Sequence, residues 1–186
     1  THYFPKVNNR YLPLEKIDDY LKNVNKPFCL IIASDYPHGP FPKTDNYNKS
    51  DIFKLPYDPN YVGNHKPGYY QNIQDDNDQL GKVLEMVDKY GHEENSMFIY
   101  ASDHGLSGKW SLQEQGLRLP FIVRWPGKIK PNTTSETLLT LVDVLPTILE
   151  VSKTKIPREL DGKSFVESLK GDDKQINEYI YGVATR

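Results

Sequence analysis

An aspartate, a histidine and a glycine occur in direct succession as Asp103, His104 and Gly105, just after the apolar run Phe98–Ala101. The β-branched and aromatic residues of that run predict a buried strand. Neighbouring side chains on a strand point to opposite faces, so the acid and the imidazole can share one centre only where the backbone bends, which the glycine permits. Lys109 follows after a second flexible pair. These residue types indicate a site for a metal ion and an anion; the alternative is a polar turn with a solvated lysine.

A second histidine, His38, lies between Pro37 and Gly39-Pro40 in the loop SDYPHGPFP. An imidazole held in place by such a loop can contact an anion or transfer a proton near neutral pH. The alternative is a histidine packed in a rigid turn, which the loop alone favours. Combined with the later loop, the set supplies an acid, two imidazoles and a lysine. Such a set could bind a metal and an oxyanion and protonate a leaving group.

The elements that would position these loops follow from the apolar patterns. Helical spacing predicts amphipathic helices over 13–25, 68–90 and 137–151, the last kinked or divided at Pro146. The face expected to be apolar in the second helix consists of Tyr69, Ile73, Leu80, Leu84 and Val87. The remaining elements predicted are strands over 28–33, 96–102, 119–125 and 179–183, a short helix over 164–169, and a long surface loop over 43–67.

This order of elements predicts an α/β fold with a largely parallel sheet flanked by helices. In such sheets, ligands collect beyond the carboxyl ends of the strands. The loops of His38 and of Asp103 each follow a predicted strand. We therefore expect the ends of the strands that carry Cys29 and Tyr100 to lie side by side, with His38 and Lys109 facing one cleft.

Composition narrows the class of partner. The 186 residues include 23 lysines and arginines against 25 acids, so no large basic field invites nucleic acid or anionic lipid. No apolar stretch has the length of a membrane span. The single cysteine, Cys29, excludes an internal disulfide framework and a multi-cysteine zinc site. Because it lies within an apolar run, we expect it to be buried and inert. A small-molecule partner fits best.

Several motifs, taken in their order along the chain, resemble those of the sulfatase family of the alkaline-phosphatase superfamily. They cover most of residues 26–171, and their common order makes the resemblance specific. The resemblance implies an alkaline-phosphatase-like fold and hydrolysis of sulfate esters, or of an N-sulfate, on a sugar or related substrate. The motifs are KPFCLIIASDYPHGPFP, GYYQNIQDDNDQLGKVLEMVDKYG, SMFIYASDHG, GKW, EQGLRLPFIVRWPGKI, LVDVLPTILEV and LDGKSFVESLKG.

By this resemblance, Asp103 and His104 are two ligands of a divalent cation, usually calcium in sulfatases. Many members have Asn where His104 stands, and calcium prefers oxygen ligands. Lys109 is similar to the lysine that contacts the sulfate group. His38 matches the histidine near the leaving oxygen, a candidate proton donor. Glycan or small-molecule sulfate esters are the implied substrates, and periplasmic, secreted or lysosomal locations are expected from the family.

One departure from the family is large. Sulfatases make a formylglycine cofactor from Cys or Ser in the pattern Cys/Ser, any residue, Pro, any residue, Arg, and this sequence contains no such pattern. The paired N-terminal aspartates of the metal shell are missing as well. The chain thus resembles the C-terminal portion of a sulfatase catalytic domain, a single partial domain over 1–186, with 172–186 entering a C-terminal subdomain. Its expected partner is the missing N-terminal part, and the chain alone is expected to be inactive.

Two alternatives remain open at this stage. A metal-dependent phosphodiesterase or phosphatase of the same superfamily would need further histidine ligands for zinc after the Asp-His pair, and His104 is the last histidine of the chain. A noncatalytic, sulfatase-like binding unit would keep the fold without the nucleophile. A formylglycine motif in the upstream coding sequence would favour the enzyme.

Overall fold

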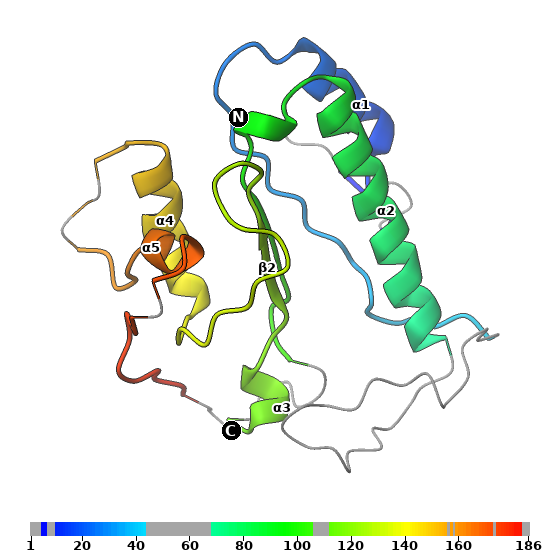
Figure 1. Ribbon diagram of the computed structural model, residues 1–186. Coiled ribbons are helices and arrows are strands. Elements are labelled where there is room, and N and C mark those ends of the chain that lie inside the picture. The colour runs from blue at the N-terminus through cyan, green and yellow to red at the C-terminus, as the bar shows by residue number, and fades with distance from the viewer. Residues whose placement is uncertain are drawn as a thin grey trace. The chain divides into compact units, whose positions relative to one another are not determined.

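The computed structural model describes residues 5–6, 10–43, 68–105, 112–155, 157, 159–172 and 174–183 (Figure 1). The chain divides into two compact units, Thr1–Glu93 and Glu94–Arg186. No helix within the described ranges combines the length and the apolar character needed to cross a membrane. The predicted loop over 43–67 lies almost entirely outside the described residues.

The first unit is built on two packed helices, α1 (Leu14–Asn23) and α2 (Tyr69–Lys89), which confirm two of the predicted helices (Figure 1). After α2 the chain turns at Gly91, whose φ of 71° lies in the left-handed region that glycine tolerates. The helices bury four aliphatic side chains, Ile17, Leu21, Val83 and Val87.

A surface cluster also joins the two helices. Asp18 accepts hydrogen bonds from the Nζ of Lys89 at 3.1 Å and from the Oη of Tyr90 at 3.0 and 2.9 Å. The hydrogen bonds from Lys89 and Tyr90 lower the pKa of the Asp18 carboxyl. The hydrogen bonds with Tyr90 and Asp18 in turn raise the pKa of Lys89. The ion pair is therefore formed throughout the neutral pH range.

The buried face of α2 differs from the predicted apolar face. Ile73 is 39% exposed, whereas the polar residues Asn72, Asp76 and Gln79 are exposed by only 2%, 6% and 7%. These three residues recur at helical spacing and continue into the buried Val83. The prediction failed at the N-terminal half of the helix because α2 there packs against polar backbone, which requires hydrogen-bonding side chains.

Residues 28–35 run extended alongside α2, in the direction opposite to the helix (Figure 1). The ring of Phe28 lies 5.6 Å from that of His92, and Ser34 donates a hydrogen bond to Asp76. The predicted strand over 28–33 is wrong, because none of the described residues pairs with this segment. Its side chains alternate between half-buried and exposed, and Ile31 is 86% exposed. Cys29 is exposed too, which corrects the expectation of a buried, inert thiol.

In the second unit, strands β1 (Phe98–Ala101) and β2 (Phe121–Arg124) pair in register, with Phe98 opposite Arg124 and Ala101 opposite Phe121. Both predicted strands are confirmed, and the chain is α/β. This pair runs antiparallel, although the element order suggested parallel strands. Beyond the strands, the Ser102 N–H donates to the Pro120 carbonyl at 3.3 Å, which continues the contact between the two segments. The sheet is half-covered, since Ile122 is 61% exposed.

The predicted helix over 137–151 begins later than expected, and the division predicted at Pro146 is wrong because α4 runs through that residue. A 3-10 turn, η3 (Leu141–Asp143), leads directly into α4 (Val144–Val151). Pro146 falls in the first turn of α4, where a backbone N–H has no helical partner, so proline is tolerated there. The remaining helices among the described residues are the short η2 (Glu93–Asn95), α3 (Glu114–Leu117) and α5 (Val166–Leu169), the last within the predicted 164–169.

Asp143 joins the C-terminal elements of this unit and is 1% exposed. Its carboxylate accepts from the backbone N–H groups of Lys163 and Thr140, both at 2.8 Å, and from Asn177 at 2.9 Å. Its carbonyl accepts from the Thr147 hydroxyl at 2.7 Å. By contrast, residues 179–183 form no strand, and Tyr181 is 90% exposed, so the strand predicted there is wrong. None of the described residues pairs with them as a strand.

Candidate active site

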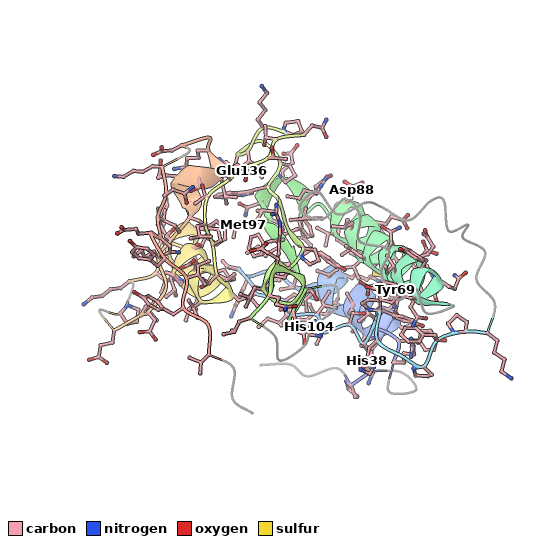
Figure 2. The ribbon with its side chains drawn as sticks, turned by 90° about the horizontal axis from the view of Figure 1, so that it is seen from below. His38, Tyr69, Asp88, Met97, His104 and Glu136 are labelled. Carbon is pink, nitrogen blue, oxygen red and sulfur yellow. The ribbon has the colours of Figure 1, made fainter. Side chains whose placement is uncertain are left out.

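His38 lies beside the first turns of α2, at the end of the helix marked by Tyr69, with Asp88 at the other end (Figure 2). Its backbone N–H donates to the Asp35 carbonyl at 3.1 Å, which closes the loop on itself. The flanking Tyr36–Pro37 and Gly39–Pro40 peptide bonds are cis. The side chain is exposed, and its Nδ1 lies 2.9 Å from the Gly39 carbonyl oxygen. The imidazole is thus accessible, whereas the loop alone favoured a packed histidine.

Asp103 and His104 lie directly after β1, at the end of that segment opposite Met97 (Figure 2). The His104 Nε2 lies 3.9 Å from the Asp103 Oδ1, and the side chains are 34% and 81% exposed, respectively. A separation of 3.9 Å is too long for a hydrogen bond. The bend predicted after the strand therefore brings the carboxylate and the imidazole to one place without pairing them directly.

Two hydrogen bonds hold the turn that carries this pair. Ser102 bonds to Pro120 on one side of the turn, and on the other the Gly105 N–H donates to the Gly116 carbonyl at 2.8 Å. Gly116 belongs to α3, so the motif EQGLRLPF supports the motif ASDHG. The second motif therefore positions the turn that carries Asp103 and His104.

The chemistry of the pair suits one divalent cation. The His104 Nδ1 lies 2.7 Å from the Gly105 carbonyl oxygen, which can only accept, so Nδ1 carries the proton. The neutral ring then has its lone pair on Nε2, the nitrogen nearer Asp103. Nitrogen and oxygen donors 3.9 Å apart can both reach an ion at ordinary ligand distances of about 2.0–2.6 Å. Within the described ranges, no cluster of three acidic, histidine or cysteine ligands occurs.

The other predicted site residue, Lys109, lies outside the residues that the structure describes. His38 belongs to the first unit and the Asp103-His104 pair to the second, so a single cleft formed by both loops stays a prediction. Sequence reasoning missed Asn72 and Arg10, which bond to the backbone of the His38 loop. For Asn72, the only signal in the sequence was a polar residue next to Ile73, a member of the predicted apolar face of α2.

Comparison with known proteins decides the family. The family model described as Sulfatase matches residues 12–154. The chain belongs to the sulfatase family. An ulvan-active sulfatase of Formosa agariphila is 45% identical over 184 residues, which cover 96% of this chain and 37% of that relative.

Solved sulfatase structures agree with this assignment. A sulfatase structure from a study of glycosaminoglycan metabolism by Bacteroides thetaiotaomicron has a TM-score of 0.68 at 27% identity, covering 91% of this chain and 40% of that one. A structure in complex with its substrate D-glucosamine-2-N,6-O-disulfate has a TM-score of 0.56 at 26% identity, covering 61% and 24%. The alkaline-phosphatase-like α/β fold is thereby confirmed. This sulfatase chain spans well under half the length of the relatives it matches.

Proposed function

We propose that the protein containing this chain is a sulfatase that hydrolyses sulfate esters of a saccharide. The observation that carries the proposal is the 45% identity to an ulvan-active sulfatase, which extends over 96% of the chain. That alignment spans both loops with candidate chemistry. A saccharide of the ulvan type is accordingly the first substrate to test. Export to the periplasm, the cell exterior or the lysosome is proposed from the family alone.

Asp103 and His104 are proposed as two ligands of a divalent cation, calcium by family resemblance. When bound, such a cation polarises and orients the oxygens of a sulfate group. The exposed carboxylate and the free Nε2 support this assignment. The nucleophile is proposed to be a formylglycine supplied from outside these 186 residues, because the sequence has no Cys/Ser-x-Pro-x-Arg pattern.

His38 is proposed to donate a proton to the leaving oxygen, and Lys109 to offset negative charge on the sulfate group. The exposed ring of His38 supports the first role, because a proton donor must reach the substrate. With Nδ1 bonded to the Gly39 carbonyl, Nε2 is the nitrogen available to the substrate. Once protonated, this nitrogen can donate to the departing oxygen.

The test compares His38→Ala and Lys109→Ala in the full-length protein on an activated aryl sulfate and on a sugar sulfate. A phenolate with a low pKa leaves without protonation, so His38→Ala should spare the aryl sulfate and slow the sugar sulfate by about a hundredfold. Lys109→Ala should slow both by about a hundredfold or more, because it removes an oxyanion contact. Equal slowing of both substrates by His38→Ala would reject its role as a proton donor. A nearly silent Lys109→Ala would reject the sulfate contact.

A further inference from the structure

The buried polar face of α2 faces the segment that carries His38. Gln79 accepts from the Leu12 N–H at 2.7 Å, and Asp76 accepts from the Ser34 hydroxyl. The first member of the series, Asn72, is 2% exposed and directs its side-chain amide at the His38 loop. Asn72, Asp76 and Gln79, which share one face of α2, thus each bind a different site within residues 12–40.

Asn72 contacts the His38 loop at carbonyl groups that the loop's own backbone N–H groups do not satisfy. The Nδ2 of Asn72 lies 3.0 Å from the carbonyl oxygen of His38 and 3.4 Å from those of Pro37 and Pro40. Prolines supply no N–H, so a proline-rich loop has more acceptors than donors. The amide nitrogen brings two N–H groups to these three carbonyl oxygens at a part-buried contact.

A second donor reaches the same carbonyl group from another segment. The Nη2 of Arg10 donates to the His38 carbonyl oxygen at 2.9 Å. The Arg10 guanidinium also stacks over the Tyr36 ring, 4.2 Å from its centroid, which fixes its direction. The backbone of His38 is thus held from two sides, while its ring stays exposed.

We propose that Asn72 is a positioning residue for the proton donor of the sulfatase reaction. It does not reach the substrate; it fixes the His38 backbone so that Nε2 is presented to the leaving oxygen at one position. Arg10 supports the same carbonyl group. This inference rests on the proposed function of His38. Misplacement by about 1 Å of a group that takes part in the chemistry can cost about a hundredfold in rate.

The experiment measures kcat of the full-length protein on an activated aryl sulfate and on a sugar sulfate for Asn72→Leu. Leucine keeps the shape of the side chain and removes both N–H groups. The sugar sulfate should slow at least about tenfold more than the aryl sulfate, because only the former needs the proton. The matched control is Gln79→Met, which removes a buried amide from the same helix face. It should slow both substrates by the same small factor. Equal slowing of the two substrates by Asn72→Leu would overturn the proposal.

A double variant separates positioning from general loss of stability. If Asn72 acts through His38, adding Asn72→Leu to His38→Ala should not increase the selectivity between the substrates any further. If the double variant is more selective between the two substrates than His38→Ala alone, the proposal is overturned. Should Asn72→Leu fail to fold, Arg10→Met removes the other donor to the same carbonyl group and should shift the selectivity in the same direction; no shift would overturn the proposal. His38→Ala alone tests the proposed function: if it shows no leaving-group dependence, that role fails independently of Asn72.

Discussion

At the scale of single residues, one hydrogen bond decides what His104 can do. Because its Nδ1 donates to the Gly105 carbonyl oxygen at 2.7 Å, the lone pair of the neutral ring lies on Nε2. The same backbone contact holds the ring on the side of Asp103 without letting the two groups pair, since they are 3.9 Å apart. Two neighbouring ligand atoms that do not bond each other are what the proposed cation site requires.

A His104→Asn substitution tests the identity of the ion. The amide oxygen is a good ligand for calcium and a poor one for zinc, which favours nitrogen and sulfur donors. Calcium affinity of the full-length protein should therefore change by less than about tenfold, while zinc affinity falls by about tenfold or more. Titration calorimetry with each metal measures both. Asp103→Ala serves as the control that lowers both affinities; calcium loss as severe in His104→Asn as in this control would contradict a calcium site.

The residue scale is where the sequence was most informative. Asp103 and His104 follow a strand that the pattern indicated, His38 follows a segment that is not a strand, and the three side chains are half-buried or exposed. Cys29 was misjudged because burial depends on what covers a residue, and an apolar run does not specify its neighbours. Asn72 was missed for a related reason: a buried amide is explained only by the carbonyl groups it binds, and those lie about thirty-five residues earlier in the chain.

At the scale of elements, the C-terminal helices are joined by a close backbone contact. A Cβ atom added at Gly162 would lie 2.0 Å from the Val142 carbonyl oxygen, which is too close for any side chain. This contact brings the chain near Asp143, which accepts from the Lys163 N–H at 2.8 Å. The motifs LVDVLPT and LDGKSF therefore form one structural unit, although the sequence shows them as separate.

Gly162→Ala should destabilise the second unit by about 3 kcal/mol, because the clash is with backbone that cannot move aside. Gly81→Ala is the matched control, since Gly81 lies within α2 and a Cβ there meets nothing within 4 Å. That substitution should instead stabilise by about 0.5–1 kcal/mol through helix propensity. Chemical denaturation of the full-length protein measures the change in stability of each variant. Amide exchange in α4 and in α2 shows where each change acts. Similar stabilities for both variants would disprove the close contact.

The Asp18 cluster predicts how the α1–α2 contact responds to pH. Hydrogen bonds lower the pKa of Asp18 below its ordinary value of 3.8, so its stabilising effect is present above that value. The effect is lost as the pH falls through the lowered pKa. Asp18→Asn should therefore weaken amide-exchange protection of α1 modestly at neutral pH and leave it unchanged at strongly acidic pH. A difference between the variants that persists at strongly acidic pH would show that the carboxylate charge is not responsible.

Helices were easier to foresee than strands, and the reason is physical. The hydrogen bonds of α1, α2 and α4 lie within each segment, so local spacing was enough to indicate them. A strand exists only where another segment pairs with it. The runs over 98–101 and 121–124 pair with each other. Residues 28–33 and 179–183 have a composition typical of strands but no described partner. Their direction of pairing also depends on the connection, which no local pattern encodes.

At the scale of the whole molecule, the described chain holds only part of what sulfatase chemistry requires. Among the described residues, Asp103 and His104 are the two proposed metal ligands, and no cluster of three occurs. The full sequence has no Cys/Ser-x-Pro-x-Arg pattern from which a formylglycine could be made. Meanwhile its extended segment at 28–33 and the β1–β2 pair expose apolar side chains, Ile31 by 86% and Ile122 by 61%.

We therefore expect the purified 186-residue chain to show no turnover of an activated aryl sulfate at any calcium concentration. Groups that act as a unit lose most of their effect when one is missing, and here the nucleophile is missing, so even a leaving group that needs no proton donor should not react. The full-length protein, assayed alongside, provides the positive control. A fluorescent dye for apolar surfaces should bind the chain more strongly than the full-length protein, because Ile31 and Ile122 are uncovered in the chain. Calcium-dependent hydrolysis by the chain alone would mean that its own side chains supply a nucleophile, and the formylglycine proposal would have to be abandoned.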